Sequence, residues 1–92
     1  MKYRSRSEII ALILETAART IEGATKTKVM YTAFLSHTQL ERYLTIALEG
    51  GLIEFQEATR TYRTTEKGLH FLQISNQLDG MISKRDGANR TM

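Results

Sequence analysis

The apolar residues change their spacing at Gly50-Gly51, and this change constrains the fold more than any other feature of the sequence. Before that point they recur at the three- and four-residue intervals of an α-helix face. Directly after it, Ile53 and Phe55 alternate with polar neighbours, which is typical of a β-strand with one buried face. We therefore predict an α+β fold, mainly α, that contains one short hairpin.

The first predicted helix covers residues 7–21. Ser7 is its expected N-cap and Gly23 ends it, while Glu15 and Arg19 form an exposed pair one turn apart. Its inward residues follow a single apolar face: Ile10, Ile13, Leu14, Ala17 and Ala18.

The second and third predicted helices are separated by a very short connection, Leu35-Ser36. Thr25 is the N-cap of the second helix, and Ser36 with Gln39 forms a capping box for the third, which stops at Gly50-Gly51. In the second helix the expected apolar residues are Val29, Met30, Ala33 and Phe34, and Tyr31 is also assigned to the core. In the third helix they are Leu40, Tyr43, Leu44, Ala47 and Leu48.

A hairpin follows, with a polar turn at residues 57–60. Pairing Phe55 with Tyr62 places Glu54 opposite Arg63 on the other face. A last helix begins after Thr65, and its apolar residues form a short seam: Phe71, Ile74, Leu78 and Met81.

This order of elements predicts a winged helix-turn-helix with a two-stranded wing and a C-terminal helix. The tight connection makes the second and third helices cross steeply, so the outer side of the third helix projects from the body. A projecting helix fits the major groove of double-stranded DNA. The hairpin beside it is placed to reach the adjacent backbone.

Positive charge is concentrated in three acid-free stretches, although the whole chain carries only +3 and has a pI of about 9.5. Residues 1–7, 24–40 and 58–65 together carry +7, which leaves −4 for the rest of the chain. Such segregation predicts one basic face on a near-neutral body, a property of polyanion-binding proteins. Solvated surface charge is the alternative interpretation.

The predicted DNA contacts come from three places. In the second helix, the backbone amides of residues 25–28 and the lysines face phosphates; in the third, outward side chains in its first half reach base edges; arginines serve the wing. The candidate residues are Lys26, Thr27, Lys28, His37, Thr38, Gln39, Arg42, Thr45, Arg60 and Arg63.

Three side chains of this region have open alternatives. Arg63 either contacts DNA or pairs with Glu54 across the hairpin. His37 is either a DNA ligand or a solvent-exposed residue of the first helical turn. We expect Glu41 to face solvent, or to repel phosphate, more readily than to read cytosine.

Several functions are not supported by the sequence. Without cysteine there is no disulfide or zinc–thiolate site. Two separated histidines (His37 and His70) are a poor metal site, and we find neither paired catalytic carboxylates nor a phosphate-binding glycine loop. We therefore expect no enzyme activity and no cofactor. No apolar run is long enough for a membrane span or a signal peptide, so we expect a cytoplasmic, nucleoid-associated protein without membrane contact.

Several motifs in order resemble the small archaeal winged-helix proteins typified by the Sulfolobus 10a chromosomal proteins and related archaeal transcriptional regulators. The motifs are residues 23–31, Leu35-Ser36, Gln39-Leu40, Tyr43-Leu44, residues 51–53, Tyr62 and residues 64–68, and the match spans residues 4–75. The resemblance implies that residues 25–28 and 36–39 lie in a DNA-binding helix-turn-helix. It also implies a homodimer that forms through the C-terminal helix. Residues 64–68 mark the start of that helix.

We predict a division of the chain into a DNA-binding domain (1–68), a dimerisation helix (65–83) and a flexible tail (84–92), the tail because of Gly80, Gly87 and the polar residues 84–86. The final helix is shorter than in the 10a type and contains Gly80. We expect a DNA-binding transcriptional regulator. An architectural chromatin protein with little sequence preference and a protein–protein adaptor are the alternatives.

Overall fold

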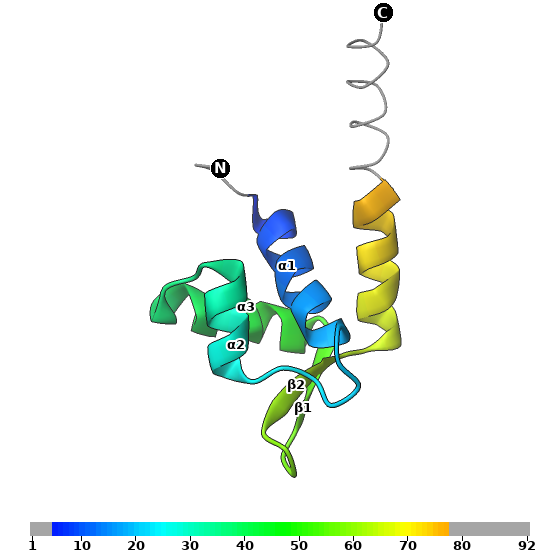
Figure 1. Cartoon of the computed structure of the whole chain (residues 1–92). Helices are drawn as coiled ribbons and strands as arrows, with labels where there is room; N and C mark the ends of the chain where they lie inside the picture. The colour runs from blue at the N-terminus through cyan, green and yellow to red at the C-terminus, as the bar shows by residue number, and fades with distance from the viewer. Residues whose placement is uncertain (1–4, 78–92) are drawn as a thin grey trace, which may run out of the picture.

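The structure, a computed structural model, describes residues 5–77. Its elements are, in chain order, α1 (Arg6–Ala18), α2 (Lys26–Ala33), α3 (His37–Glu49), β1 (Ile53–Gln56) and β2 (Thr61–Thr64), followed by a helix over residues 66–77, here called the C-terminal helix. In Figure 1, α2 and α3 lie on one side of α1, the C-terminal helix lies on the other side, and the hairpin closes the lower end. The predicted α+β fold class, mainly helical, is confirmed.

Helix α1 starts earlier and ends earlier than predicted. The Glu8 N–H donates to Ser5 Oγ at 3.1 Å, and the Ser5 N–H donates to Glu8 Oε1 at 2.9 Å. This capping box makes Ser5 the N-cap, so the assignment of that role to Ser7 was wrong. The helix ends before Arg19, and the predicted Glu15–Arg19 pair is absent from the ion pairs of residues 5–77.

The core lies between the three helices and the inner face of the hairpin. Its largest fully buried side chains are Ile13, Leu14, Val29 and Leu40. Val29 and Ala33, one turn apart on α2, are completely buried, as the apolar spacing predicted.

Four residues assigned to the core are exposed instead. Phe34 is 83% exposed and Tyr31 is 71% exposed. Helix α2 has only eight residues and ends at Phe34 in a left-handed conformation (φ 55°), so the helical spacing no longer applies to that side chain. Ala18 and Leu48 lie at the ends of their helices and are also exposed.

The hairpin has the predicted register, with Phe55 opposite Tyr62 and Glu54 opposite Arg63. Strand β2 also forms a bridge with Ala24 on its other edge: the Ala24 N–H donates to the Tyr62 carbonyl at 2.9 Å, and the Tyr62 N–H donates to the Ala24 carbonyl at 2.7 Å. Gly23 has φ 90°, and a Cβ there would meet the Tyr62 carbonyl. Gly23 therefore permits this bridge and does not end α1 as predicted.

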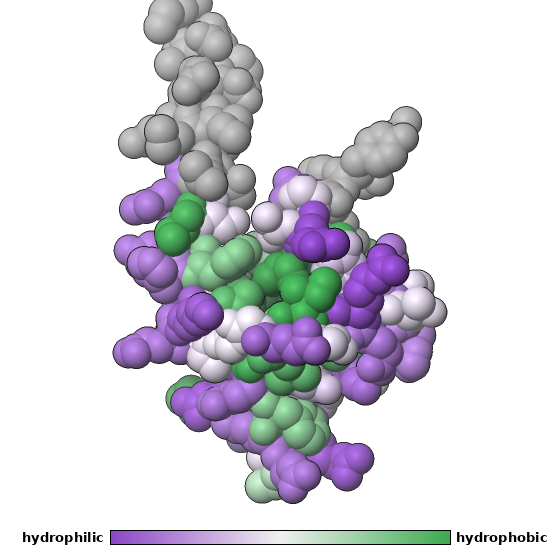
Figure 2. Space-filling view, turned by 180° about the vertical axis from the view of Figure 1, so that it is seen from behind, coloured by the Kyte–Doolittle hydropathy of each residue, from purple (hydrophilic) through white to green (hydrophobic). Residues whose placement is uncertain are grey.

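The C-terminal helix packs closely against the hairpin. Thr65 is its N-cap, since Thr65 Oγ1 accepts the Gly68 N–H at 3.1 Å, and a Cβ at Gly68 would meet the Leu52 carbonyl. Phe71 is half-buried against the core, whereas Ile74 is 45% exposed. Seen from behind, hydrophobic side chains gather beside this helix (Figure 2). Leu78, Met81 and the predicted tail lie outside the described residues.

Candidate nucleic-acid interface

The turn between α2 and α3 fixes the direction in which α3 leaves the body. After Phe34, the buried Leu35 donates its N–H to the Met30 carbonyl at 3.0 Å. The predicted capping box then forms: the Gln39 N–H donates to Ser36 Oγ at 3.2 Å, and the Ser36 N–H donates to Gln39 Oε1 at 3.0 Å. The Gln39 side chain, a predicted DNA contact, therefore holds the start of α3.

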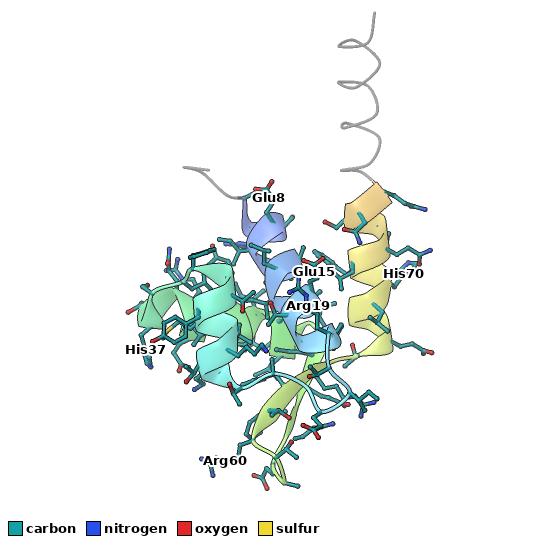
Figure 3. The ribbon with its side chains drawn as sticks, in the orientation of Figure 1. Glu8, Glu15, Arg19, His37, Arg60 and His70 are labelled. Atoms are coloured by element: carbon teal, nitrogen blue, oxygen red, sulfur yellow. The ribbon has the colours of Figure 1, made fainter. Side chains whose placement is uncertain are left out.

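The outer side of α3 is polar over residues 37–45, where it is formed by His37, Thr38, Glu41, Arg42 and Thr45. All are exposed except Glu41, which is half-buried, while the inward residues of the same helix are packed in the core. The Thr45 hydroxyl donates to the Glu41 carbonyl at 2.9 Å, so its proton is not available to a ligand. Figure 3 places His37 at the margin of the molecule, away from His70 on the C-terminal helix.

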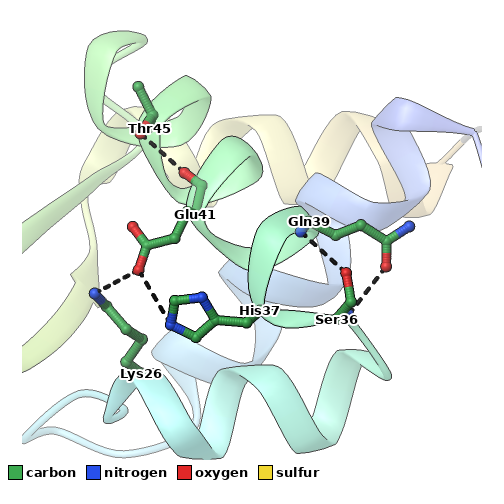
Figure 4. Close-up of polar contacts among 6 residues, drawn as sticks. All are labelled: Lys26, Ser36, His37, Gln39, Glu41 and Thr45. Carbon is green, nitrogen blue, oxygen red and sulfur yellow. Dashed lines mark hydrogen bonds and ion pairs between the residues drawn. The ribbon is translucent and has the colours of Figure 1, made fainter.

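A salt bridge joins α2 to the outer side of α3. Lys26 Nζ lies 2.8 Å from Glu41 Oε2, and His37 Nε2 lies 3.9 Å from the same oxygen (Figure 4). The hydrogen bond from Lys26 lowers the pKa of Glu41, and the same bond raises the pKa of Lys26. Glu41 is thus the partner of a predicted phosphate-binding lysine, while its side chain stays 47% exposed to solvent.

The start of α2 presents exposed polar side chains and a backbone amide that is already bonded. The Lys28 N–H donates to the capping Thr25 Oγ1 at 3.1 Å, so this amide is already bonded within the N-cap, and the placement of the amides of residues 25–28 near phosphates stays a prediction. The side chains of Thr27 and Lys28 are exposed. Within residues 5–77 Lys28 makes no ion pair, which leaves its ammonium available.

The wing, which we define as β1, β2 and their turn, lies beside the start of α2. A cavity of about 250 Å³ between them, here called the wing cleft, is lined by Lys26, Phe55, Arg60 and Tyr62. The Phe55 and Tyr62 ring centroids are 5.0 Å apart with an interplanar angle of 49°. Arg60 ends the turn with φ 55°, and Figure 3 shows it near the wing tip.

Two residues that were predicted to belong to the basic face, Arg6 and Arg63, lie away from α2, α3 and the wing cleft. The positive charges therefore do not form one face. Arg6 begins α1 at the end opposite the hairpin (Figure 1). Arg63 lines a second hollow at the base of the wing, together with residues 17–21, Thr64 and Leu69. It does not pair with Glu54, although the two face each other in the register. Lys2 and Arg4 are outside the described residues.

Comparison with known proteins matches this geometry to a family. A sequence model described as "Winged helix-turn-helix" matches residues 3–83. The chain belongs to the winged helix-turn-helix family. Among solved structures, Sso10a-2, a DNA-binding protein from Sulfolobus solfataricus, is similar with a TM-score of 0.75, at 23% sequence identity, over 96% of this chain and 92% of that one. This winged helix-turn-helix therefore has the fold of the 10a type that the sequence resembles. No curated protein matches the chain.

The wing cleft and the Lys26–Glu41 salt bridge were not predicted from the sequence. The opposite charges of Lys26 and Glu41 are present in the sequence. Their contact depends on the angle between α2 and α3, which the sequence pattern does not specify. Among the described residues, no three metal-ligating side chains cluster, and none of the helices there is both long and apolar enough to cross a membrane.

Proposed function

We propose that this winged helix-turn-helix binds double-stranded DNA with the outer side of α3, the start of α2 and the wing. The observation that supports it most is the polar outer side of α3, on which Arg42 is exposed, together with the exposed Lys28 of α2, which makes no ion pair within residues 5–77. A helix that presents such groups enters the major groove, and cations beside it neutralise phosphates. The similar protein Sso10a-2 is described as DNA-binding, which agrees with this proposal.

The contacts divide by chemistry. Arg42 is the proposed base reader, because its guanidinium can donate two hydrogen bonds to guanine. Thr38 and His37 supply shorter contacts to a base or a phosphate. Lys28 and Arg60 bind the flanking backbone. Lys26 joins them only when it leaves Glu41.

The biological role that we propose is transcriptional regulation by a nucleoid-associated homodimer, without enzyme activity or cofactor. An architectural protein would bind by the same surface but with little preference among sequences. An unbiased selection of bound duplexes at two salt concentrations separates the two roles. A recovered motif supports the regulator, and an unbiased pool supports the architectural role.

The DNA contact is tested by fluorescence anisotropy with a labelled blunt duplex at several salt concentrations. We expect Lys28→Ala to weaken binding and to reduce the slope of log K against log salt by about 0.9, the value for one lost phosphate contact. Arg6→Ala is the matched control, since it removes the same charge at the far end of α1. Equal effects of the two variants, or binding that does not depend on salt, would contradict the proposal.

A further inference from the structure

The wing cleft contains an aromatic surface formed by Phe55 and Tyr62. Phe55 is 43% exposed even though it lies on the same face of the hairpin as the buried Ile53. Tyr62, only 8% exposed, supports its ring from the core side. Exposure alone does not distinguish Phe55, since Phe34 and Tyr31 are more exposed. The ring of Phe55 differs from theirs because it lines a cleft together with two cations, Lys26 and Arg60.

The two cations of the cleft differ in their surroundings: Arg60 has a left-handed backbone conformation, and Lys26 is bound to Glu41. Arg60 has a left-handed backbone, which costs a non-glycine residue about 1 kcal/mol or more. Such strain tends to persist where a side chain has a function. Lys26 reaches the cleft from α2 while bound to Glu41. An incoming phosphate competes with that carboxylate for the same ammonium.

Aromatic rings beside positive charge are the combination that binds unpaired nucleotides. The ring stacks on a base, and the cations hold the adjacent phosphate. Contact with the backbone of an intact duplex needs the cations but not the ring, because paired bases are stacked within the duplex. The exposed face of Phe55 therefore distinguishes the two ligands.

We propose that the wing cleft binds one unpaired DNA nucleotide, with its base stacked on Phe55 and its phosphate between Arg60 and Lys26. The inference rests on the proposed DNA binding and extends it. The protein would then favour duplexes that carry an overhanging or bulged nucleotide next to the wing over fully paired ones.

The test compares three labelled duplexes of one sequence: blunt, with a single overhanging 2-aminopurine nucleotide, and with an abasic nucleotide in the same overhang. We expect the 2-aminopurine overhang to bind about 5- to 150-fold more tightly than the blunt duplex, the range of one stacked base. Its fluorescence should fall on binding. The abasic duplex, which has the phosphate without the base, should bind like the blunt one.

Three variants test whether the preference for the 2-aminopurine overhang depends on the Phe55 ring. Phe55→Leu keeps an apolar contact with Tyr62 and should abolish both the preference and the fluorescence change, so that this variant binds the 2-aminopurine overhang no more tightly than the blunt duplex. Phe55→Tyr should keep both. Phe34→Leu is the matched control, because it replaces the other strongly exposed phenylalanine outside the cleft. Thermal unfolding by circular dichroism verifies that each variant folds.

Equal affinity for the three duplexes, or a preference that survives Phe55→Leu, would overturn this inference while leaving duplex binding intact. If the abasic overhang binds as tightly as the 2-aminopurine one, phosphate and not stacking is recognised, and the inference is likewise wrong. Absence of salt-dependent binding to all three would instead contradict the proposed DNA binding itself.

Discussion

Lys26 shows how one contact changes the interpretation of a predicted site residue. Its exposed position at the start of α2 agrees with a phosphate contact, but its ammonium lies 2.8 Å from Glu41. In free protein, the pair reduces the positive charge that the interface offers to DNA. Glu41 therefore sets how strongly the start of α2 attracts phosphate.

We predict that Glu41→Gln tightens binding to a blunt duplex, because it releases Lys26 and removes a negative charge from the interface. The expected gain is roughly threefold to tenfold at low salt, with a salt slope steeper by about 0.9. Anisotropy titrations measure both quantities. Glu15→Gln, the same change on exposed α1 surface, should have a much smaller effect, and equal gains would show that only net charge matters.

The salt bridge also predicts a pH effect. In the folded protein the hydrogen bond from Lys26 lowers the pKa of Glu41, so the pair stabilises the fold above the carboxyl's unfolded pKa. That stabilisation is lost as the pH falls through the lowered value. Carboxyl NMR titration should show that the pKa of Glu41 lies below the ordinary range for a glutamate. In the Lys26→Ala variant the pKa of Glu41 should return to that range. An unchanged pKa in the variant would exclude Lys26 as the cause.

At the scale of elements, patterns that depend on neighbouring residues were predicted well. The capping box at Ser36, the N-caps Thr25 and Thr65 and the hairpin register are all confirmed. Errors arose where a second local signal competed, as when the Ser5–Glu8 box replaced Ser7 at the start of α1. The wing cleft was beyond reach, since it joins residues of α2 and the hairpin that only the tertiary fold brings together.

At Gly68, helix propensity and packing have opposite effects on the stability expected for an alanine variant. In an ordinary helix, Gly→Ala stabilises by about 1 kcal/mol. Here the new methyl group would meet the Leu52 carbonyl and lie 2.6 Å from Thr64 Cγ2. We expect Gly68→Ala to destabilise the fold by about 1–3 kcal/mol, as measured by denaturant unfolding.

The control for this prediction is Gln73→Ala, an exposed change on the same helix, which should stay within about 0.5 kcal/mol of the wild type. Stabilisation by Gly68→Ala would mean that the C-terminal helix does not pack against Leu52 as described.

For the whole molecule, assembly remains a prediction. Half of the predicted dimer seam lies in the described residues, and its two members differ: Phe71 is partly covered by the chain's own core, and Ile74 is exposed. The apolar surface beside the C-terminal helix (Figure 2) is where a second copy would pack.

We expect a homodimer in sedimentation equilibrium at tens of micromolar, and we expect Ile74→Lys to shift it towards monomer, because a charge in an apolar seam is costly to bury. Gln77→Lys places the same charge at an exposed polar position of that helix and should leave the dimer in place. A wild-type monomer at these concentrations would contradict the homodimer.

Amide chemical-shift mapping during titration with a short duplex shows whether DNA binds the face formed by α2, α3 and the wing. We predict that the largest changes fall in residues 26–28, 37–45 and 57–62, and that residues 17–21 and Leu69, around the hollow at the base of the wing, change little. Changes concentrated around that hollow, or at the start of α1, would mean that DNA binds a different face.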